Sequence, residues 1–261
     1  LLSQSKHHDW QNTQPGQFFM LNVPSVGEAP FTFTSPPNQR GEFRAFIRQM
    51  GTATSALFSM RPGQVLGARG PFGQGWPINN IANNNTLIIA GGCGLAPLVN
   101  LIDILIDKTL NQSNQQELVL IYGARNKQSQ MLNPERKRWQ ESIRIFNTLD
   151  DITGKNDSSG VIHGTPLDVL PQAMASFASP ATRALLCGPE AMMTVLASRL
   201  VQQGIAAEDI YLSIERRMHC AVGLCGHCYL GSQYACKDGP TFSWQKLQPM
   251  IQDGANPVAT T

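Results

Sequence analysis

The first third of the chain carries short apolar runs that are separated by breaks rich in proline and glycine. These runs occupy residues 18–23, 31–34, 43–48 and 64–67. Short strands at such close spacing are typical of a small antiparallel barrel or sandwich. A turn-rich segment at 70–77 and a polar segment at 79–85 follow. We therefore predict a small antiparallel β-barrel domain over residues 1–84.

Beyond residue 84 the pattern changes to a repeated order of strand, turn and helix. Continuous apolar runs predict strands at 86–90, 117–122, 144–148, 184–187 and 210–214. Apolar residues at helical spacing predict helices over 98–110 and 189–203. Because continuous apolar strands that alternate with helices are typical of parallel sheets, we predict a doubly wound α/β domain over 85–214. Residues 215–261 fit neither pattern and are assigned to a small C-terminal lobe.

Composition limits the classes of protein that fit this chain. Its 261 residues suffice for two domains and a small appendage. Charged residues make up 15%, below the usual ~25%, which favours a subunit that buries surface against partners. The net charge of +2 does not predict a nucleic-acid groove. No apolar run is long enough for a membrane span or a signal peptide, and the crowded cysteines do not look like a secreted disulfide framework, so we expect a cytoplasmic protein. The chain starts without Met, and we expect that it begins inside a longer natural product.

Four of the six cysteines are crowded near the C-terminus, at Cys220, Cys225, Cys228 and Cys236. The first three have the spacing C-x4-C-x2-C, which opens the plant-type ferredoxin pattern, and Cys236 supplies a fourth thiolate. This spacing predicts a 2Fe–2S cluster. A structural zinc ion, which prefers two C-x2-C pairs, and disulfide bonds are the alternatives.

Small and imidazole side chains accompany these cysteines. Glycines at 223, 226 and 231 allow the backbone to wrap closely around the ligands and to direct N–H groups at sulfur. His219 and His227 flank two of the ligands, and we expect them to be solvated or to donate to sulfur. The charged residues 215–217 either form a docking rim or a solvated turn.

Two glycine-rich turns follow predicted parallel strands. The first contains Gly91, Gly92, Gly94, Ala96 and Pro97. The second contains Cys187, Gly188, Pro189 and Met192. Each turn opens a predicted helix, whose free N–H groups favour an anion. Because open α/β sheets bind ligands at the carboxyl ends of their strands, we predict a nucleotide site there.

Arg125, Cys93 and a basic run at 136–138 are interpreted separately. Arg125 follows the strand 117–122 and suits an adenosine or phosphate group, although an exposed loop arginine is the alternative. Cys93 is interpreted as a packing residue. The basic run Arg136 to Arg138 is interpreted as the charged outer face of a helix, without a role in function.

Together these motifs resemble the ferredoxin–NADP⁺ reductase superfamily, in which a flavin-binding barrel precedes a nicotinamide-binding α/β domain. The resemblance covers almost the whole chain, apart from a first barrel strand or two. It implies that the chain binds NAD(P)(H) and a flavin, FAD rather than FMN. It also implies that Cys187 lines the site of hydride transfer.

The flavin signature of this superfamily falls on two segments of the N-terminal domain. The resemblance assigns cofactor binding to Pro30, Phe31, Thr32, Phe33, Thr34, Arg48, Gly51 and Thr54. The usual motif Arg-x-Tyr-Ser is replaced here, because Ala29, Phe31 and Thr32 occupy its places. The usual arginine partner of the pyrophosphate is therefore absent, and Arg48 or the backbone near Thr54 can replace it. Simple alternation of an ordinary strand is the other interpretation of residues 31–34.

The cysteine-rich segment is most similar to the gamma subunit of cytosolic NiFe hydrogenases of the sulfhydrogenase type. It is also similar to the B subunit of anaerobic sulfite reductase and to the electron-transfer subunit of dihydroorotate dehydrogenase. The resemblance implies an electron-transfer oxidoreductase that works in a hetero-oligomer with hydrogenase catalytic and iron–sulfur subunits. Other interpretations are a different catalytic partner, a stand-alone reductase of a ferredoxin, and a redox-sensing regulator without catalysis.

Overall fold

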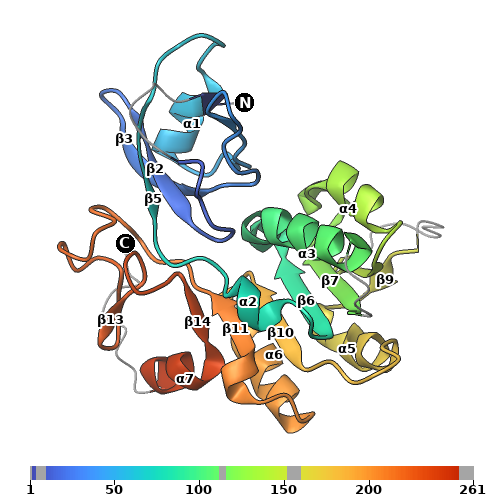
Figure 1. Ribbon diagram of the computed structural model, residues 1–261. Coiled ribbons are helices and arrows are strands. Elements are labelled where there is room, and N and C mark those ends of the chain that lie inside the picture. The colour runs from blue at the N-terminus through green and yellow to red at the C-terminus, as the bar shows by residue number, and fades with distance from the viewer. Residues whose placement is uncertain (1, 4–9, 112–115, 152–159, 253–261) are drawn as a thin grey trace. The chain divides into compact units, whose positions relative to one another are not determined.

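The computed structural model describes residues 2–3, 10–111, 116–151 and 160–252 of the chain (Figure 1). These residues fold into two compact units. The first unit contains the described residues of 1–76, 214–241 and 249–261. The second unit contains those of 77–213 and 242–248. Most of the N-terminal segment in which we expect no signal peptide lies outside the described residues.

The N-terminal part of the first unit is an antiparallel sheet with the strand order β3-β2-β5. Its strands are β2 (Phe18–Val23), β3 (Gly27–Thr32) and β5 (Gly67–Phe72). A separate pair is formed by β1 (Leu2–Ser3) and β4 (Glu42–Phe43), and a short helix α1 (Thr52–Phe58) follows. The antiparallel arrangement confirms the prediction. Within the part of the chain that the structure describes, the strands form an open sheet and a pair, and they do not close into a barrel.

Strand β2 is covered on both of its faces, which explains its continuous apolar sequence. Phe19 and Leu21 point into an aromatic core with Trp10 and Phe33. The rings of Trp10 and Phe33 meet edge to face, with centroids 5.6 Å apart. Such contacts between aromatic rings stabilise a core beyond the area that they bury.

The opposite face of β2 is covered by residues 214–241, which we call the cysteine segment. Phe18 and Met20 of β2 point to this side. The residues of the cysteine segment that pack there are Met218, Ala221, Cys228, Ala235 and Cys236. The segment also contains the short hairpin β12 (Tyr229–Leu230) and β13 (Gln233–Tyr234). The cysteine segment therefore shares a core with the N-terminal sheet.

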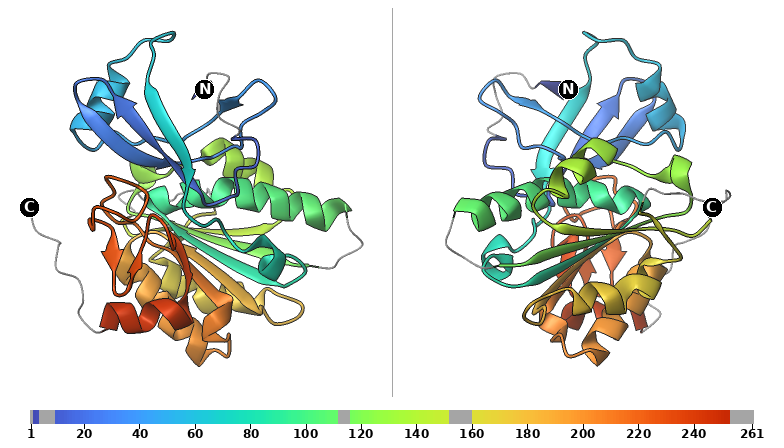
Figure 2. Two further views of the ribbon diagram at one scale, coloured as in Figure 1. Left: turned by 60° about the vertical axis from the view of Figure 1, so that its left-hand side comes forward. Right: turned by 90° about the vertical axis from the view of Figure 1, so that its right-hand side faces the viewer.

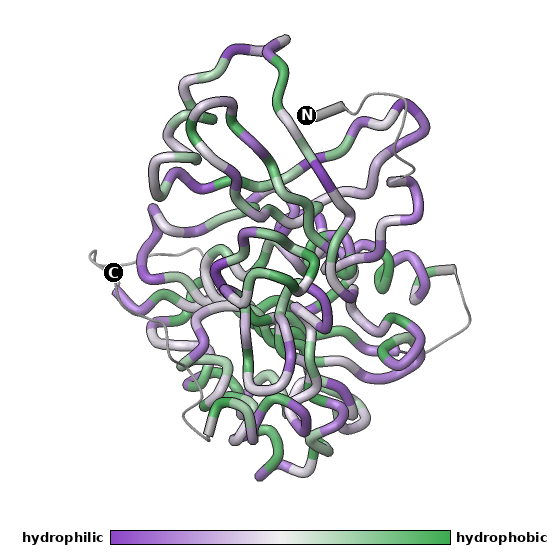
Figure 3. Tube along the Cα trace, turned by 90° about the vertical axis from the view of Figure 1, so that its left-hand side faces the viewer, coloured by the Kyte–Doolittle hydropathy of each residue, from purple (hydrophilic) through white to green (hydrophobic). Residues whose placement is uncertain are grey.

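The second unit is built on a seven-stranded sheet with the order β14-β11-β10-β6-β7-β8-β9. Its strands are β6 (Thr86–Gly91), β7 (Leu118–Ala124), β8 (Arg144–Leu149), β9 (Ile162–His163), β10 (Arg183–Cys187), β11 (Ile210–Ser213) and β14 (Thr241–Ser243). The pairs from β11 through β9 are parallel, which confirms the predicted doubly wound domain. Every residue of β6 and β7 is buried, and Figure 3 shows hydrophobic stretches in the interior of the trace.

Helices cover both faces of this sheet. The α-helices of this part of the chain are α2 (Ile78–Ile81), α3 (Val99–Asn111), α4 (Asn133–Trp139), α5 (Pro166–Ala175), α6 (Glu190–Gln202) and α7 (Trp244–Gln252). Short 3₁₀ turns are η1 (Gly92–Leu98), η2 (Lys127–Ser129) and η3 (Ala207–Asp209). Figure 2 shows α3 and α4 on one face and α5 and α6 on the other. The connections that follow the neighbouring strands β6 and β10 therefore lie on opposite faces of the sheet.

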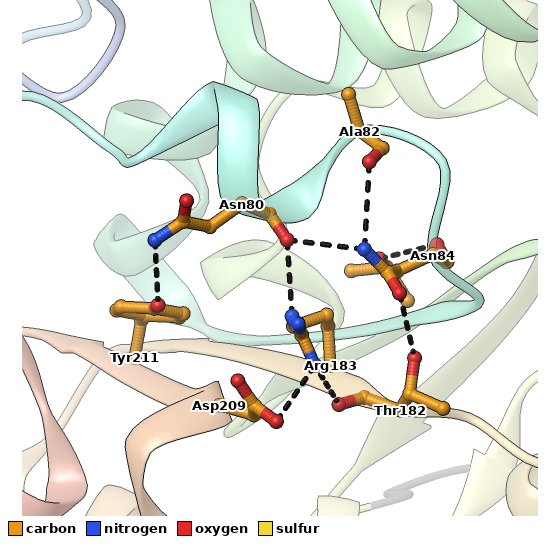
Figure 4. A network of polar contacts seen from close by, with 8 residues as sticks. Asn80, Ala82, Asn84, Thr182, Arg183, Asp209 and Tyr211 are labelled. Carbon is orange, nitrogen blue, oxygen red and sulfur yellow. Dashed lines mark hydrogen bonds and ion pairs between the residues drawn. The ribbon is translucent and has the colours of Figure 1, made fainter.

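A polar network closes the amino edge of the sheet (Figure 4). Arg183 of β10 forms an ion pair of 2.7 Å with Asp209 and donates a hydrogen bond of 3.0 Å to the carbonyl of Asn80. Asn80 also approaches the hydroxyl of Tyr211 at 3.5 Å. This network fixes α2 to β10 and β11. It lies at the strand ends opposite to the predicted nucleotide site, so we assign it a role in folding.

Candidate functional site

The two glycine-rich turns leave neighbouring strands at the carboxyl edge of the sheet. In the parallel pair of β6 and β10, Cys187 lies opposite Ala90. The chain continues from β6 to α3 on one face and from β10 to α6 on the other (Figure 2). Ligands of open α/β sheets bind at such a reversal of strand order. We call residues 91–97 and 187–192 the nucleotide turns.

The two nucleotide turns touch each other through Gly94. A Cβ atom at this position would lie 2.3 Å from the carbonyl oxygen of Cys187 and 2.5 Å from the nitrogen of Gly188. Both of those atoms belong to the backbone and cannot move aside as a side chain can. Only glycine allows this approach of the turns.

Gly91 and Gly188 complete the contact between the turns. A Cβ atom on Gly91 would lie 2.9 Å from Sδ of Met192 and from Cδ of Pro189. Gly188 has a φ of +151°, and a Cβ atom there would lie 3.0 Å from Cα of Gly91. The structure therefore brings Gly91, Gly94, Cys187, Gly188, Pro189 and Met192 together, as their predicted common role requires.

The open side of the first turn lies at Gly92. This residue has a φ of +52°, and no atom lies within 4 Å of the place where its Cβ would stand. Ala96 is buried and Pro97 lies inside η1, which leads directly into α3. The helix thus begins at Val99 after a 3₁₀ turn that contains Pro97. The open space beside the half-buried backbone of Gly92 fits the close approach of a phosphate group.

Two cysteines lie in the nucleotide turns. Cys187 is 1% exposed at the end of β10, and Cys93 is half-buried within η1. The burial of Cys187 in this tight junction is compatible with a packing role. Its assignment to hydride transfer stays a prediction.

Arg125 lies just beyond the neighbouring strand β7. Gly123 of β7 pairs with Gly91 of β6, so Arg125 is two residues past this pair at the same carboxyl edge. Its side chain is exposed. The carbonyl of Arg125 accepts a hydrogen bond of 2.8 Å from the N–H of Asp151, which joins the ends of β7 and β8. Arg125 is thus placed at the predicted edge, and its contact with a nucleotide stays a prediction.

The interpretation of residues 136–138 as an outer face was wrong for Arg136. Its side chain is 4% exposed, and its guanidinium lies 4.5 Å from the centre of the Tyr122 ring. Arg136 donates hydrogen bonds to the carbonyl of Met131 at 3.1 Å and to Oδ1 of Asn133 at 2.7 Å. It also donates to Oδ1 of Asn147.

These hydrogen bonds explain how a cation is buried here without a carboxylate. Burial lowers the pKa of Arg136 and raises the pKa of Tyr122. The sequence held a signal for this arrangement, since Arg136 lies three residues before the buried Trp139. Residues at that spacing share one face of a helix.

Gly51 and Thr54 of the predicted flavin site form one turn at the start of α1. The hydroxyl of Thr54 accepts hydrogen bonds from the N–H groups of Met50 at 2.9 Å and of Gly51 at 3.0 Å. This hydroxyl also donates to the carbonyl of Gly51 at 3.0 Å. No atom lies within 4 Å of the Cβ position of Gly51, so the turn is open on that side. An open turn at the start of a helix fits a phosphate of the flavin, and this contact stays a prediction. Arg48 is exposed ahead of this turn.

The predicted residues 30–34 run along β3 and just past its end. Phe33 is 1% exposed within the aromatic core, so its side chain is a packing residue. Phe31 packs against the same core from a half-buried position. Thr32 donates a hydrogen bond of 3.3 Å to the carbonyl of Gln17. The alternation of an ordinary strand therefore explains the two aromatic residues, and flavin contacts of Pro30, Thr32 and Thr34 stay predictions.

In the cysteine segment, backbone N–H groups point at sulfur. Sγ of Cys220 accepts hydrogen bonds from Leu224 at 3.3 Å and from Cys225 at 3.4 Å, and Val222 lies at 3.5 Å. Sγ of Cys236 accepts one from Gly223 at 3.2 Å. Hydrogen bonds of this kind stabilise a thiolate ligand.

A left-handed backbone makes this arrangement of N–H groups. Ala221 has a φ of +61° and Gly223 a φ of +75°. A positive φ costs ~1–2 kcal/mol for a residue with a Cβ. Ala221 was not predicted as a special position, because alanine gives no sign of such a backbone.

Two of the four thiols differ strongly in exposure and in pKa. Cys225 is exposed, and hydrogen bonds from the backbone of His227 lower its pKa to about 7. Cys236 is buried, and burial raises its pKa to about 12. The thiol of Cys220 interacts with that of Cys225, and the thiol of Cys228 with that of Cys236. All six cysteines lie within the described residues, and none of them forms a disulfide.

The donor set of this segment fits an iron–sulfur cluster. Its four soft thiol donors on one segment, with N–H groups directed at two of them, match the requirements of cluster ligation. Within the described ranges, no three His, Cys, Asp or Glu side chains are grouped to hold a single metal ion. The fit therefore rests on the chemistry of the four donors and on the backbone around them. No helix among the described residues is long and apolar enough to span a membrane.

Comparisons with known families divide the chain into three matched regions. Residues 4–76 match the oxidoreductase FAD-binding domain, and residues 88–198 match the oxidoreductase NAD-binding domain. Residues 215–248 match the iron–sulfur cluster binding domain of dihydroorotate dehydrogenase B. These matches fall on the N-terminal sheet, on the sheet with the nucleotide turns and on the cysteine segment.

Two groups of relatives are similar over most of the chain. Sulfhydrogenase 1 subunit gamma of Pyrococcus furiosus is 31% identical over 88% of this chain and 79% of its own length. A probable dihydroorotate dehydrogenase B (NAD(+)) electron transfer subunit of Pyrococcus abyssi is 31% identical over 90% of this chain and 81% of its own length.

Solved structures share the fold. A structure of an NADH-dependent reduced ferredoxin-NADP oxidoreductase superimposes with a TM-score of 0.71 at 22% identity and covers 94% of this chain and 84% of its own. The cytochrome b5 reductase domain of Ulva prolifera nitrate reductase gives a TM-score of 0.59 at 20% identity, over 79% of this chain and 87% of its own.

Proposed function

Since this chain belongs to the family of FAD- and NAD-binding oxidoreductases that carry a C-terminal iron–sulfur domain, we propose that it is the electron-transfer subunit of a hydrogenase complex. In this role it moves electrons between NAD(P)(H), FAD and a 2Fe–2S cluster. The catalytic step at hydrogen takes place on a partner subunit.

The three cofactors divide the chemistry between them. A nicotinamide exchanges two electrons as hydride, a cluster exchanges one electron at a time, and a flavin can do both. The protein supplies the positions. The nucleotide turns hold the phosphates of the dinucleotide, and the turn at Gly51 and Thr54 holds a phosphate of the flavin. Cys220, Cys225, Cys228 and Cys236 hold the cluster.

The observation that carries the proposal is the position of β2 within the first unit. One face of this strand packs on the core that contains Phe31 and Phe33 of the predicted flavin segment. Its other face packs on Cys228 and Cys236. The flavin segment and the cluster ligands are thus built on one sheet. Such an arrangement supports transfer of electrons between the two cofactors inside one unit.

The identity of the partner is supported by the relatives. Two gamma subunits of sulfhydrogenases from Pyrococcus furiosus are 31% and 30% identical to this chain. A dihydroorotate dehydrogenase partner is the second candidate, because residues 215–248 match the cluster domain of that enzyme. The low share of charged residues, 15%, is in keeping with burial of surface in a complex. The cytoplasmic location stays a prediction.

Native co-purification tests the choice of partner. We expect the complex isolated from cells through a tag on this chain to contain nickel and to reduce NAD(P)⁺ with hydrogen gas. A complex without nickel that reduces NAD⁺ with dihydroorotate would establish the second candidate instead. Absence of both activities from an intact complex would contradict both.

Spectroscopy of the purified chain tests the electron pathway. NAD(P)H should bleach the flavin band and the iron–sulfur shoulder of the wild-type protein. In Cys236→Ser we expect loss of the cluster signal, while NAD(P)H still bleaches the flavin. Cys93→Ser is the matched control for the cluster, because Cys93 lies in the other unit and is not a proposed ligand, and it should retain the cluster signal. Retention of a full cluster by Cys236→Ser would refute the proposed ligand set.

A further inference from the structure

One arginine connects the N-terminal sheet to the first proposed cluster ligand. Arg69 lies in β5, and its guanidinium donates Nε to Oε1 of Glu28 at 2.8 Å and Nη2 to Oε2 at 2.7 Å. Glu28 lies in β3, on the other side of the central strand β2. A bidentate pair of this kind fixes the orientation of the planar guanidinium.

The remaining donors of Arg69 reach the cysteine segment. Nη1 donates to the carbonyl of Cys220 at 2.7 Å, and Nη2 donates to the carbonyl of His219 at 2.8 Å. The guanidinium also lies 5.4 Å from the centre of the Phe72 ring. Two successive carbonyls, the second of them on the ligand residue itself, are therefore held by one side chain.

Of the two charged groups in this ion pair, the cation is the one in contact with the cysteine segment. The cation of Arg69 contacts the backbone of Cys220, and Glu28 contacts Arg69 on the β3 side. The side chains of Arg69 and Glu28 are 41% and 23% exposed. An ion pair with this much exposure contributes little to stability, about 0–1 kcal/mol. The positive charge of Arg69 instead acts on the electrostatic potential at Cys220, whose carbonyl it contacts.

Reduction of a cluster adds one negative charge to it. A nearby cation favours the reduced form, and charge and hydrogen bonding around the sulfur ligands are the protein's means of setting the potential. We propose that Arg69, oriented by Glu28, is a positioning residue that holds Cys220 in place and raises the reduction potential of the cluster. This inference rests on the proposed function, because it requires a cluster on Cys220.

Substitution of each partner separates the effect of charge from that of structure. Arg69→Gln removes the cation and leaves Glu28 unpaired, so the potential should fall. We expect a shift of roughly tenfold in the reduction equilibrium, which equals ~59 mV for a one-electron couple. Glu28→Gln keeps the arginine and its bonds to both carbonyls, and it should raise the potential. Arg69→Lys keeps the positive charge but lacks the planar guanidinium. It should shift the reduction potential of the cluster less than half as far as Arg69→Gln.

The measurement is a redox titration of the purified chain, followed by electron paramagnetic resonance of the reduced cluster at one fixed pH. Arg138→Gln is the matched control, because it breaks an exposed ion pair with Asp103 in the other unit. It should leave the potential unchanged. Shifts of the same sign in Arg69→Gln and Glu28→Gln, or no shift in either, would overturn the inference. If Arg69→Gln does not hold a cluster, Glu28→Gln decides alone, and an unchanged potential in it overturns the inference.

A second readout does not need the cluster. In the metal-free chain, hydrogen exchange of residues 221–225 should be faster in Arg69→Gln than in the wild type, because the carbonyls of 219 and 220 are released. Exchange unchanged by the substitution would contradict the positioning role.

Iron and sulfide analysis of the wild type distinguishes a failure of the proposed function from a failure of the role of Arg69. A wild-type chain that binds no iron refutes the proposed function, whereas a cluster with an unchanged potential in the variants refutes only the role of Arg69.

Discussion

The nucleotide turns and the cysteine segment solve the problem of holding a cofactor in different ways. The nucleotide turns contact each other through backbone atoms, and three glycines leave no room there for a Cβ atom. In the cysteine segment the proposed ligands range from buried Cys236 to exposed Cys225. Leu224, between two ligands, is 83% exposed. The first site is shaped by the core of a parallel sheet, and the second by hydrogen bonds along a surface segment.

This difference follows from what each site must bind. A dinucleotide is a large ligand that needs a fixed surface, and the ends of buried strands supply one. A cluster makes covalent bonds to its ligands, so the protein needs only to bring the thiols close and to satisfy the sulfurs. Substitutions at the closely packed glycines of the nucleotide turns should therefore be poorly tolerated, whereas the cysteine segment should be sensitive at its proposed ligands and its left-handed residues.

The largest expected effect is that of Gly94→Val in the nucleotide turns. A Cβ atom there meets the backbone of Cys187 and Gly188, so we expect a loss of about 3 kcal/mol in the free energy of unfolding, measured in urea. NAD(P)H should no longer bleach the flavin. Gly92→Ala is the matched control, since its surroundings are open and only its positive φ costs free energy, about 1 kcal/mol. Equal losses in the two variants would remove the contrast between close packing and backbone conformation.

Thiol alkylation of the metal-free chain compares the two sites directly. Iodoacetamide reacts with thiolates, and the pKa of about 7 at Cys225 makes its rate rise as the pH passes through that value. At pH 8, Cys225 should react more than ~100-fold faster than Cys187, which is buried, or than Cys236, which is buried and has a pKa raised to about 12. Peptide mass spectrometry over time measures each rate. Comparable rates at Cys225 and Cys187 would show that the nucleotide turns open as readily as the cysteine segment.

A smaller effect is expected at Gly223. Its φ of +75° is strained for alanine, and a Cβ atom would approach the side chain of Lys237 at 3.1 Å. Gly223→Ala should destabilise the fold by ~1–2 kcal/mol and speed the release of iron to a chelator. Ser232→Ala, at an exposed position of the same segment, is the control. A chelation rate equal to that of the control would mean that the left-handed turn does not support the ligands.

The smallest effect concerns a buried hydrogen bond behind the nucleotide turns. The hydroxyl of Tyr122 accepts a bond of 2.9 Å from the N–H of Met131, so Tyr122→Phe leaves a buried donor unpaired. We expect a loss of about 1 kcal/mol in thermal or urea unfolding. Tyr211→Phe should cost less, because the hydroxyl of Tyr211 is 3.5 Å from its donor on Asn80. A greater loss in Tyr211→Phe would reverse the ranking of the two contacts.

Several features of the fold were open to prediction because they depend on neighbouring residues in the chain. The continuous apolar runs at 86–90 and 184–187 identified parallel strands, and the glycines after them identified the turns. The match of three family regions agrees with these assignments and with the spacing of the four cysteines. Arg136 was misinterpreted because a charged residue in a helix is usually exposed. Its burial depends on acceptors at Met131, Asn133 and Asn147, and the contact with Asn147 of β8 forms only when α4 packs on the sheet.

The sequence by itself determined the alternation of strands and helices, the positions of the glycine turns and the number and spacing of the thiols, since each of these is a local pattern of side-chain size and polarity. Only the tertiary structure decided that Gly94 meets Cys187, that Cys236 shares a core with β2, and that Arg69 holds the carbonyl of Cys220. These contacts join residues far apart in the chain. The local preferences of residues for helix, strand or turn cannot predict these contacts, because the contacts form only when the sheets are packed.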